Sequence, residues 1–325
     1  MIKKYFFKFF FIFFFIFLAL FYTKLILQSF YPALPKKGEV AKFYSNQCRD
    51  DLNFLFLHAI KKANKSIHMV MFGLTDRSIL KALQNRSLDL NVYYDKRSSD
   101  ISLENENFHP LKASGLIHQK ILVIDKKMVF IGSANMTKTS LLMHNNLVIG
   151  FYSPKIAKFL MEKTPFGVDE IKSSVGGQKL EIFLLPNKNA LERTKKIITR
   201  AKEKIKIAMF TFTNMELIEE LIYAKKRGVQ ISVVVDYNSA IGTSKEAVEK
   251  LKKENIKIML SQGIQLLHHK YLYVDDKTLV CGSANWTKAA FKKNKDLVLI
   301  LNLAEKQKKF MNNLQKIIEE EAIDF

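Results

Sequence analysis

Cysteine is scarce in this chain of 325 residues, which contains only Cys48 and Cys281. Two isolated cysteines supply neither the spaced ligand set of a zinc site nor the framework of a disulfide-rich domain, so both classes are excluded. The apolar run 278–281 favours a buried thiol at Cys281. A Cys48–Cys281 bridge stays open for a chain outside the cytoplasm, because sequence alone does not give the distance between the two Cα atoms. The sequence thus predicts no metal and no cofactor.

Acidic residues are also in short supply, because 31 Asp and Glu stand against 52 Lys and Arg, for a formal net charge of +21. A positive field of this size concentrates polyanions such as nucleic acid, anionic lipid or other phosphate esters. A lysine-rich composition also arises from genomic bias, so charge alone leaves the partner open. With 48% hydrophobic residues the chain can bury two cores of ordinary size, which argues against disorder.

A long apolar run lies near the start of the chain. Residues 9–22 contain no charged residue and follow three lysines. The run is shorter than the ~20 residues of a spanning helix, so a cleaved signal peptide is an alternative. No small-residue cleavage site follows, and Lys8 and Lys24 can reach the two interfaces, so we predict an uncleaved membrane anchor over residues 1–30. The leading lysines favour export of the rest of the chain to the periplasm or cell exterior.

The remainder of the chain contains an internal duplication. Segment 64–75 matches segment 202–213, and each is an alternating apolar strand between two amphipathic helices. A second strand ends in aspartate in both copies, at Asp95 and Asp236. Strand–helix–strand units of this kind predict an α/β fold of two similar α-β-α halves, with mixed, mostly parallel sheets related by a pseudo-twofold axis.

The two copies are separated by a stretch in which the periodicity breaks. It contains Pro165, Gly167 and the pair Gly176-Gly177, which are typical of loops. We therefore expect a first half over residues 38–155, a linker over 156–177 and a second half over 178–325.

One pattern of six fixed residues, His-x-Lys-x4-Asp-x6-Gly-Ser-x-Asn, occurs in both copies without a gap. Its members are His118, Lys120, Asp125, Gly132, Ser133 and Asn135 in the first copy, and His268, Lys270, Asp275, Gly282, Ser283 and Asn285 in the second. Two matches in register within a duplication are far more specific than a lone short motif.

The spacing of the pattern has a chemical interpretation. Histidine and lysine two residues apart on a strand project from the same face, so an imidazole and an ammonium can address one phosphate. A Gly-Ser step lets the backbone approach a ligand, and asparagine can donate to a phosphate oxygen. Two copies related by pseudo-twofold symmetry would complete one phosphate site. The expected phosphate-binding residues are Lys120, Ser133, Asn135, Lys270, Ser283 and Asn285.

Three other histidines lack partners in the pattern and are interpreted as structural: His68, His109 and His144.

The doubled pattern resembles the HKD motif of the phospholipase D superfamily, over nearly all of residues 38–300. The resemblance implies a metal-independent phosphodiesterase in which one histidine attacks phosphorus and forms a phosphohistidine. The other histidine protonates the leaving oxygen and then activates water. The implied catalytic set is His118, Lys120, Asp125, His268, Lys270 and Asp275. The compact copies look most like the branch of small bacterial nucleases and mitochondrial-type cardiolipin hydrolases.

Members of this superfamily usually carry a carboxylate, after the Gly-Ser-x-Asn segment, that orients a catalytic histidine. Asp296 stands 28 residues after His268, whereas Asn146 stands 28 residues after His118. We therefore expect a His268–Asp296 pair and a His118–Asn146 pair. A carboxylate favours imidazolium, so His268 is the expected general acid and His118 the nucleophile. Reduced activity is the alternative interpretation of Asn146.

Two substrate classes fit this site. The apolar N-terminal segment favours a phospholipid, and the charge favours nucleic acid: subtracting the four lysines of residues 1–30 from +21 leaves +17 for the rest. Alternatives are an endonuclease specifically, transfer to an alcohol in place of water, and a non-catalytic surface protein that binds DNA or lipid. Because both half-sites lie in one chain, we expect a catalytically self-sufficient monomer.

Overall fold

The computed structural model describes residues 10–11, 13–23, 31–84, 87–99, 105–263 and 265–325. They fall into two units, Met1–Ala33 and Leu34–Phe325. In the first unit, residues 10–11 and 13–23 are helical. The anchor expected over residues 1–30 lies partly outside the described residues, and no helix within them has the length and apolar character needed to cross a membrane.

The first part of the second unit is built on a seven-stranded sheet of order β1-β7-β6-β5-β2-β3-β4. Its strands are β1 (Lys42–Tyr44), β2 (Ser66–Met71), β3 (Asp89–Asp95), β4 (Phe108–Leu111), β5 (Lys120–Ile124), β6 (Met128–Gly132) and β7 (Val148–Tyr152). Its helices are η1 (Asn46–Cys48), α2 (Leu52–Lys61), α3 (Arg77–Gln84), α4 (Lys138–Leu142) and α5 (Pro154–Lys163). Local sequence sets the helix starts: Asp51 caps α2, and Ser153 followed by proline begins α5.

The second part is built on a nine-stranded sheet of order β16-β12-β11-β10-β13-β14-β15-β9-β8. Its strands are β8 (Glu170–Val175), β9 (Gln178–Leu184), β10 (Lys204–Met209), β11 (Gln230–Val235), β12 (Lys257–Leu260), β13 (Lys270–Val274), β14 (Thr278–Gly282), β15 (Leu297–Asn302) and β16 (Ile323–Asp324). Its helices are α6 (Lys188–Thr199), α7 (Met215–Lys226), α8 (Tyr237–Ile241), α9 (Lys245–Lys253), α10 (Lys288–Lys292) and α11 (Glu305–Glu320).

The mixed α/β fold with two similar halves is confirmed, but the sheets are mostly antiparallel. Parallel pairing is confined to β2-β3-β4 and β10-β11-β12, where strands are joined by crossovers. The strands that carry the doubled pattern are antiparallel neighbours, namely β5-β6-β7 and β13-β14-β15. The expectation of mostly parallel sheets is therefore wrong. Short turns join β5 to β6 and β13 to β14, and the chain returns antiparallel to β7 and β15 after the short helices α4 and α10.

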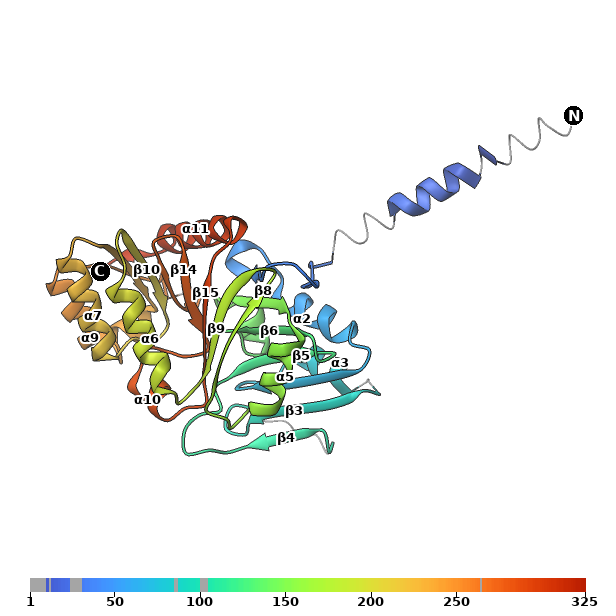
Figure 1. Ribbon diagram of the computed structural model, residues 1–325, viewed down its shortest axis with the longest axis horizontal. Coiled ribbons are helices and arrows are strands. Elements are labelled where there is room, and N and C mark those ends of the chain that lie inside the picture. Colours follow the sequence, from blue (N-terminus) through green and yellow to red (C-terminus); the bar gives the residue numbers. More distant parts are fainter. Residues whose placement is uncertain (1–9, 12, 24–30, 85–86, 100–104, 264) are drawn as a thin grey trace, which may run out of the picture. The chain divides into compact units, whose positions relative to one another are not determined.

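Figure 1 shows the two sheets and the helices that cover them. Three apolar clusters account for their packing. One lies between the first sheet and α2 and α3, and one lies between the second sheet and α6, α7 and α9. The third contains side chains of both sheets together with α5 and α11, for example Val123, Tyr271 and Met311. The two halves therefore share a buried core along their common interface.

One local expectation is corrected by this arrangement, and one open alternative is resolved. Residues 156–177, expected to be a linker, contain most of α5 and the edge strand β8, which pairs with β9 in the second sheet. The backbone of this stretch is thus held by a helix and a hairpin despite its glycines. Cys48 and Cys281 are both free thiols, and Cys281 is buried as its apolar neighbours suggest.

Candidate active site

The glycine of each pattern lies where the next strand crosses close by. A Cβ on Gly132 would lie 2.2 Å from the carbonyl oxygen of Leu147, and one on Gly282 would lie 2.2 Å from that of Leu297. Gly282 also has a φ of +146°. Glycine is therefore required by the neighbouring strand, and the expected approach of the backbone to a ligand is not the reason for it.

Short backbone bridges join the two halves at their catalytic segments. The N–H of His118 donates to the carbonyl of Lys295 at 2.7 Å, and the N–H of His268 donates to the carbonyl of Asn145 at 3.0 Å. Both contacts belong to isolated parallel bridges. Each histidine is thus docked beside the residue that precedes the orienting residue of the opposite half.

The side-chain pairs are consequently crossed between the halves. Nδ1 of His118 lies 2.8 Å from Oδ1 of Asp296, and Nδ1 of His268 lies 3.0 Å from Oδ1 of Asn146. Both orienting residues bind a histidine, but the expected pairs His268–Asp296 and His118–Asn146 are wrong. The alignment of the two copies assigned each partner within its own half, whereas the backbone bridges connect opposite halves.

Ser133 and Ser283 hold the orienting groups in place. Oγ of Ser133 donates to Oδ1 of Asn146 at 2.9 Å, and Oγ of Ser283 donates to Oδ1 of Asp296 at 2.7 Å. Each hydroxyl also accepts a backbone N–H, from the residue that follows its partner. The expected phosphate-binding role of the two serines is therefore wrong, since the single proton of each hydroxyl is already donated.

This network also fixes the proton positions on the imidazoles. Nδ2 of Asn146 donates to the carbonyls of Ser140 and His144 at 2.7 and 3.0 Å, so its Oδ1 is the acceptor of a hydrogen bond from Nδ1–H of His268. The Asp296 carboxylate accepts in the same way from His118. Each neutral ring then carries its proton on Nδ1 and a lone pair on Nε2.

The two histidines, the two lysines and Asp296 shift one another's pKa values. Burial lowers the pKa of His118, with Lys120 adding to the effect and Asp296 opposing it. Burial, Lys270 and Lys120 bring the pKa of His268 well below its ordinary value of 6.5. Burial alone would raise the pKa of Asp296, but its contact with His118 lowers it. Without a bound anion, the site therefore holds two neutral imidazoles and one carboxylate at neutral pH.

Lys120 and Lys270 are buried with only 3% of their surface exposed. Each Nζ donates to the carbonyl of the histidine two residues earlier, at 2.7 and 2.8 Å. Burial lowers the pKa of Lys120 to about 7, and burial together with Lys120 lowers the pKa of Lys270 well below 10.5. Within the described part of the chain neither ammonium forms an ion pair with a carboxylate. A phosphate between them would supply the missing negative charge.

Two phenylalanines complete the walls of the site and were missed by the sequence analysis. The Phe72 ring lies 5.1 Å from Nζ of Lys120 and 4.9 Å from the His118 ring. Phe210 bears the same relation to the second lysine and histidine, at 4.9 and 5.3 Å. These faces stabilise the cations and exclude water. A signal was available, because both copies carry Met-Phe at the same place in the matched segments.

The two pattern asparagines border the site, and both are partly exposed. Oδ1 of Asn135 accepts the N–H of Gly73 at 3.3 Å, which leaves its Nδ2 as a donor. Oδ1 of Asn285 is buried and has no partner among the described residues. His144, interpreted from sequence as structural, has its ring 6.0 Å from that of His268 and its pKa lowered by burial and by Lys270. It therefore belongs to the edge of the site.

The aspartates of the pattern lie away from the histidines. Asp125 follows the five-residue strand β5, which separates it from Lys120 by roughly 16 Å. Its carboxylate accepts the N–H groups of residues 64, 65 and 66 at 2.9, 2.7 and 3.2 Å. Asp275 accepts those of residues 202–204, each at 2.9 Å. The expected catalytic role of both aspartates is wrong, because they cap the starts of β2 and β10.

We expect Asp125→Ala to lower the free energy of unfolding by about 2–4 kcal/mol, because three backbone donors lose a charged acceptor. Burial raises the pKa of Asp125 but the three donors outweigh it and lower the pKa, so its contribution is present above the unfolded pKa and disappears as the pH falls through the folded value. Urea unfolding at pH 7 measures the loss. Asp89→Ala, which removes an exposed ion pair with Lys126, is the control and should cost less than about 1 kcal/mol. Equal effects of the two substitutions would contradict the capping role.

No group of three or more His, Cys, Asp or Glu side chains within the described ranges is placed to hold a metal ion. The donor set around the two histidines is instead two ammonium groups and two carboxamides. Such a set binds an anion directly.

Comparison with known proteins places this geometry in a family. The family model described as "Cardiolipin synthase, PLD-like domain" matches residues 56–164 and 194–320, which include both catalytic segments. The crystal structure of phosphatidylserine synthase from Haemophilus influenzae Rd KW20 superposes with a TM-score of 0.69, covering 93% of this chain and 92% of that one at 14% identity. That likeness supports the two-half fold.

Curated relatives match over shorter segments. A mitochondrial cardiolipin hydrolase of Mus musculus is 29% identical over 136 residues, which are 41% of this chain and 60% of the relative. A phospholipase D of Rickettsia bellii (strain RML369-C) is 27% identical over 116 residues, which are 36% of this chain and 57% of the relative. The chain thus spans little more than half the length of these relatives. Since the family model covers most of the chain and both of its patterns, this protein belongs to the phospholipase D superfamily, in the family of cardiolipin synthase-like PLD domains.

Proposed function

We propose that this protein hydrolyses phosphodiesters by the two-histidine mechanism of the phospholipase D superfamily. The observation that carries the proposal is the crossed pair of buried histidines, each held at Nδ1 by a side chain of the opposite half, beside two buried lysines that form no ion pair within the described residues. Such a cluster of buried cations is costly for a protein to maintain unless an anion is bound to it. A phosphodiester anion fits the four groups.

In the first step the Nε2 lone pair of His118 attacks phosphorus, and the bond from phosphorus to the leaving oxygen breaks. His268, protonated on Nε2, donates its proton to that oxygen, so that an alcohol departs. In the second step the now neutral His268 removes a proton from water as the water oxygen attacks phosphorus. The N–P bond then breaks, which releases the phosphomonoester and restores neutral His118. Lys120 and Lys270 stabilise the phosphoryl oxygens in both steps.

The crossed partners support this division of labour for a reason that differs from the sequence argument. Attack on phosphorus makes the His118 ring cationic, and Asp296 at 2.8 Å stabilises the charge that develops. The neutral amide of Asn146 gives His268 no such stabilisation, so a protonated His268 is a stronger acid toward the leaving oxygen. His118 thus remains the proposed nucleophile and His268 the general acid.

The substrate is proposed to be a phospholipid or a nucleic acid. Names of relatives, cardiolipin hydrolase and phospholipase D, support a lipid, and the positive charge supports nucleic acid. We expect a protein spanning residues 31–325, offered phosphatidyl lipids and single-stranded DNA in EDTA, to hydrolyse at least one of them. Activity that is lost in EDTA and regained only with a divalent ion would contradict the proposal. Release of phosphatidate or of 5′- or 3′-phosphorylated oligonucleotide identifies the class.

Attachment to a membrane through residues 1–30, with the catalytic unit outside the cytoplasm, is part of the proposal. Its support is the apolar run flanked by lysines. Protease accessibility of the catalytic unit in intact cells, with and without permeabilisation, tests the location.

The low pKa of His268 predicts the pH dependence. The acid must be protonated before substrate binds, and its pKa is lowered well below 6.5. We therefore expect kcat/KM to rise as the pH falls below neutrality, because kcat/KM reports groups of the free enzyme. In Asn146→Asp a carboxylate would face His268 and raise its pKa, so the profile should move to higher pH by about 1 unit or more. Asn189→Asp, at an exposed position of α6, is a charge-matched control. An unmoved profile in Asn146→Asp would contradict the assignment of the acid.

A further inference from the structure

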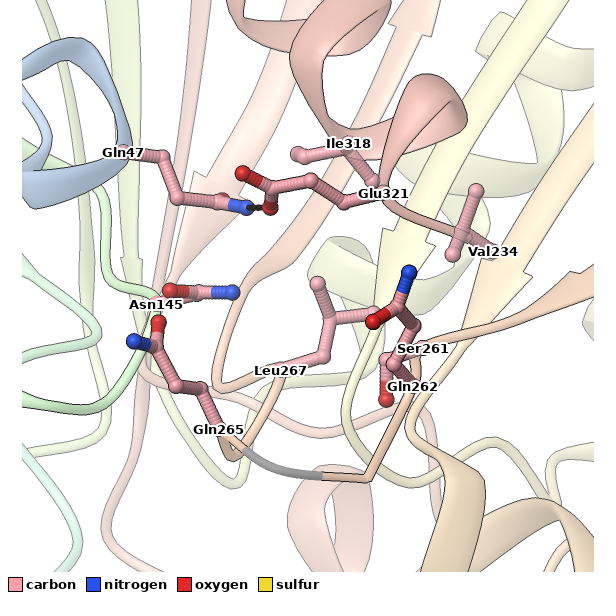
Figure 2. A pocket seen from close by; sticks show the side chains of 9 residues that line it. All are labelled: Gln47, Asn145, Val234, Ser261, Gln262, Gln265, Leu267, Ile318 and Glu321. Atoms are coloured by element: carbon pink, nitrogen blue, oxygen red, sulfur yellow. Dashed lines mark hydrogen bonds between the residues drawn. The ribbon is translucent and has the colours of Figure 1, made fainter. Parts of the chain in front are cut away.

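A pocket of about 230 Å³ is lined in part by Asn145 and Leu267, which directly precede Asn146 and His268 in the sequence. Figure 2 shows it between η1, the segment before β7, the loop after β12 and the end of α11. Nine residues line it: Gln47, Asn145, Val234, Ser261, Gln262, Gln265, Leu267, Ile318 and Glu321.

Asn145 points into this pocket with an unused side chain (Figure 2). The residue is only 6% exposed. Its backbone is fully engaged, because its N–H donates to the carbonyl of Leu266 at 2.9 Å and its carbonyl accepts from His268 at 3.0 Å. Its carboxamide makes no hydrogen bond to any residue that the structure describes. The carboxamide atoms reach the pocket, which they line, so they can donate to and accept from a bound molecule.

The other polar groups of the lining limit the class of molecule that could bind. Three further carboxamides and the Ser261 hydroxyl face the cavity, and the only charged lining residue is Glu321, whose carboxylate accepts from Nε2 of Gln47 at 2.7 Å. No Lys or Arg and no aromatic ring is among the described lining residues. An anion would lack a counter-charge, and a nucleobase would lack a stacking surface. A neutral, hydroxyl-rich molecule meets the amides with its oxygens and the apolar floor of Val234, Leu267 and Ile318 with its C–H groups.

Two residues that line the pocket are sequence neighbours of the proposed general acid and its partner. Asn145 and Leu267 pair with each other in a parallel bridge, and the next residue of each segment belongs to the Asn146–His268 pair. Neighbouring side chains of an extended segment face opposite sides, so the pocket and the catalytic site lie back to back. Gln47, at the far wall, also contacts Nε2 of His269 through its Oε1 at 2.7 Å.

We propose that this pocket binds a small neutral polyol of the glycerol class, and that its occupancy is transmitted to His268 through the Asn145 backbone. The polyol satisfies the Asn145 carboxamide and fixes the segment that positions the Asn146–His268 pair. Binding itself does not depend on the proposed activity, whereas an effect on turnover does.

The test is saturation-transfer NMR on the full chain with glycerol as the probe and uridine as the competing class. We expect glycerol to bind and uridine not to bind. Asn145→Leu removes the unpartnered amide while leaving the backbone bonds, and should weaken glycerol binding about tenfold. Gln262→Leu, at an exposed position of the rim, tests the same site should Asn145→Leu not fold. Gln84→Leu, at an exposed position of α3 in the first half, is the matched control and should bind glycerol as the wild type does.

The coupling is measured on 13C-labelled histidine, where glycerol should shift the His268 resonances in the wild type and leave them unmoved in Asn145→Leu. Binding that is equal in Asn145→Leu and wild type would overturn the site. Uridine binding in place of glycerol would overturn the ligand class, and saturation by glycerol without a His268 shift would overturn the coupling. A shift without any hydrolysis of phosphodiesters would contradict the proposed function while leaving the pocket intact.

Discussion

His118→Ala is expected to form no phosphoenzyme with any substrate and to lose about 10⁴-fold or more of its turnover, because no other group can take over the attack on phosphorus. His268→Ala should behave differently. It retains the nucleophile and lacks only the acid, which typically contributes about 10²–10⁴-fold when the leaving oxygen is strongly basic. With a p-nitrophenyl phosphodiester, whose leaving group needs no proton, His268→Ala should still become phosphorylated and accumulate the intermediate.

Mass spectrometry of acid-labile, base-stable phosphohistidine measures both outcomes. His109→Ala, on edge strand β4, is the matched control and should be phosphorylated and turned over as the wild type. Label on His268 of the wild-type protein would reverse the two roles and leave the two-histidine mechanism in place. A fully active His118→Ala variant would remove the mechanism altogether.

The doubled pattern was sufficient to predict that the two histidines and two lysines meet in one site, but it could not predict which side chains hold the histidines. His118 and Lys120 share a strand, and their proximity follows from local geometry. The pairing of His118 with Asp296 depends on how two halves dock, over a separation of 178 residues. Sequence copies aligned with each other carry no information about contacts between them. The crossed pairs therefore required the structure.

The same distinction explains the errors about Asp125 and Ser133. Both residues recur in the pattern, and recurrence was taken as contact with phosphate. Asp125 recurs because the start of β2 needs an acceptor for three N–H groups, and Ser133 recurs because Asn146 needs a fixed orientation. A residue that positions another can be as invariant between copies as one that touches substrate. Phe72 was missed for the opposite reason, since an apolar residue at the end of a buried strand resembles ordinary core.

Because each histidine is held by the opposite half, we expect catalytic activity to require both halves of the same chain. His118 needs Asp296, His268 needs Asn146, and the cluster that contains Val123 and Tyr271 is common to both sheets. All of these groups belong to one chain, so each molecule should carry one complete site. A mixture of His118→Ala and His268→Ala, each inactive on a substrate with a poor leaving group, should therefore remain inactive.

The mixture is first denatured and refolded together, which gives exchanged assemblies every opportunity to form, and is then assayed beside each variant refolded alone. Recovery of activity above the sum of the two variants would mean that sites assemble between chains, and would contradict the monomer. A refolded wild-type sample controls for recovery of the fold. The second half alone, residues 178–325, should have no measurable turnover, because it lacks the attacking His118 and Lys120, and because Asn146 is absent to hold His268. When two half-sites are joined in one chain, we expect both results: the isolated half has no activity, and the mixture of variants regains none. A separated half loses its catalytic partners and also the shared core that positions them.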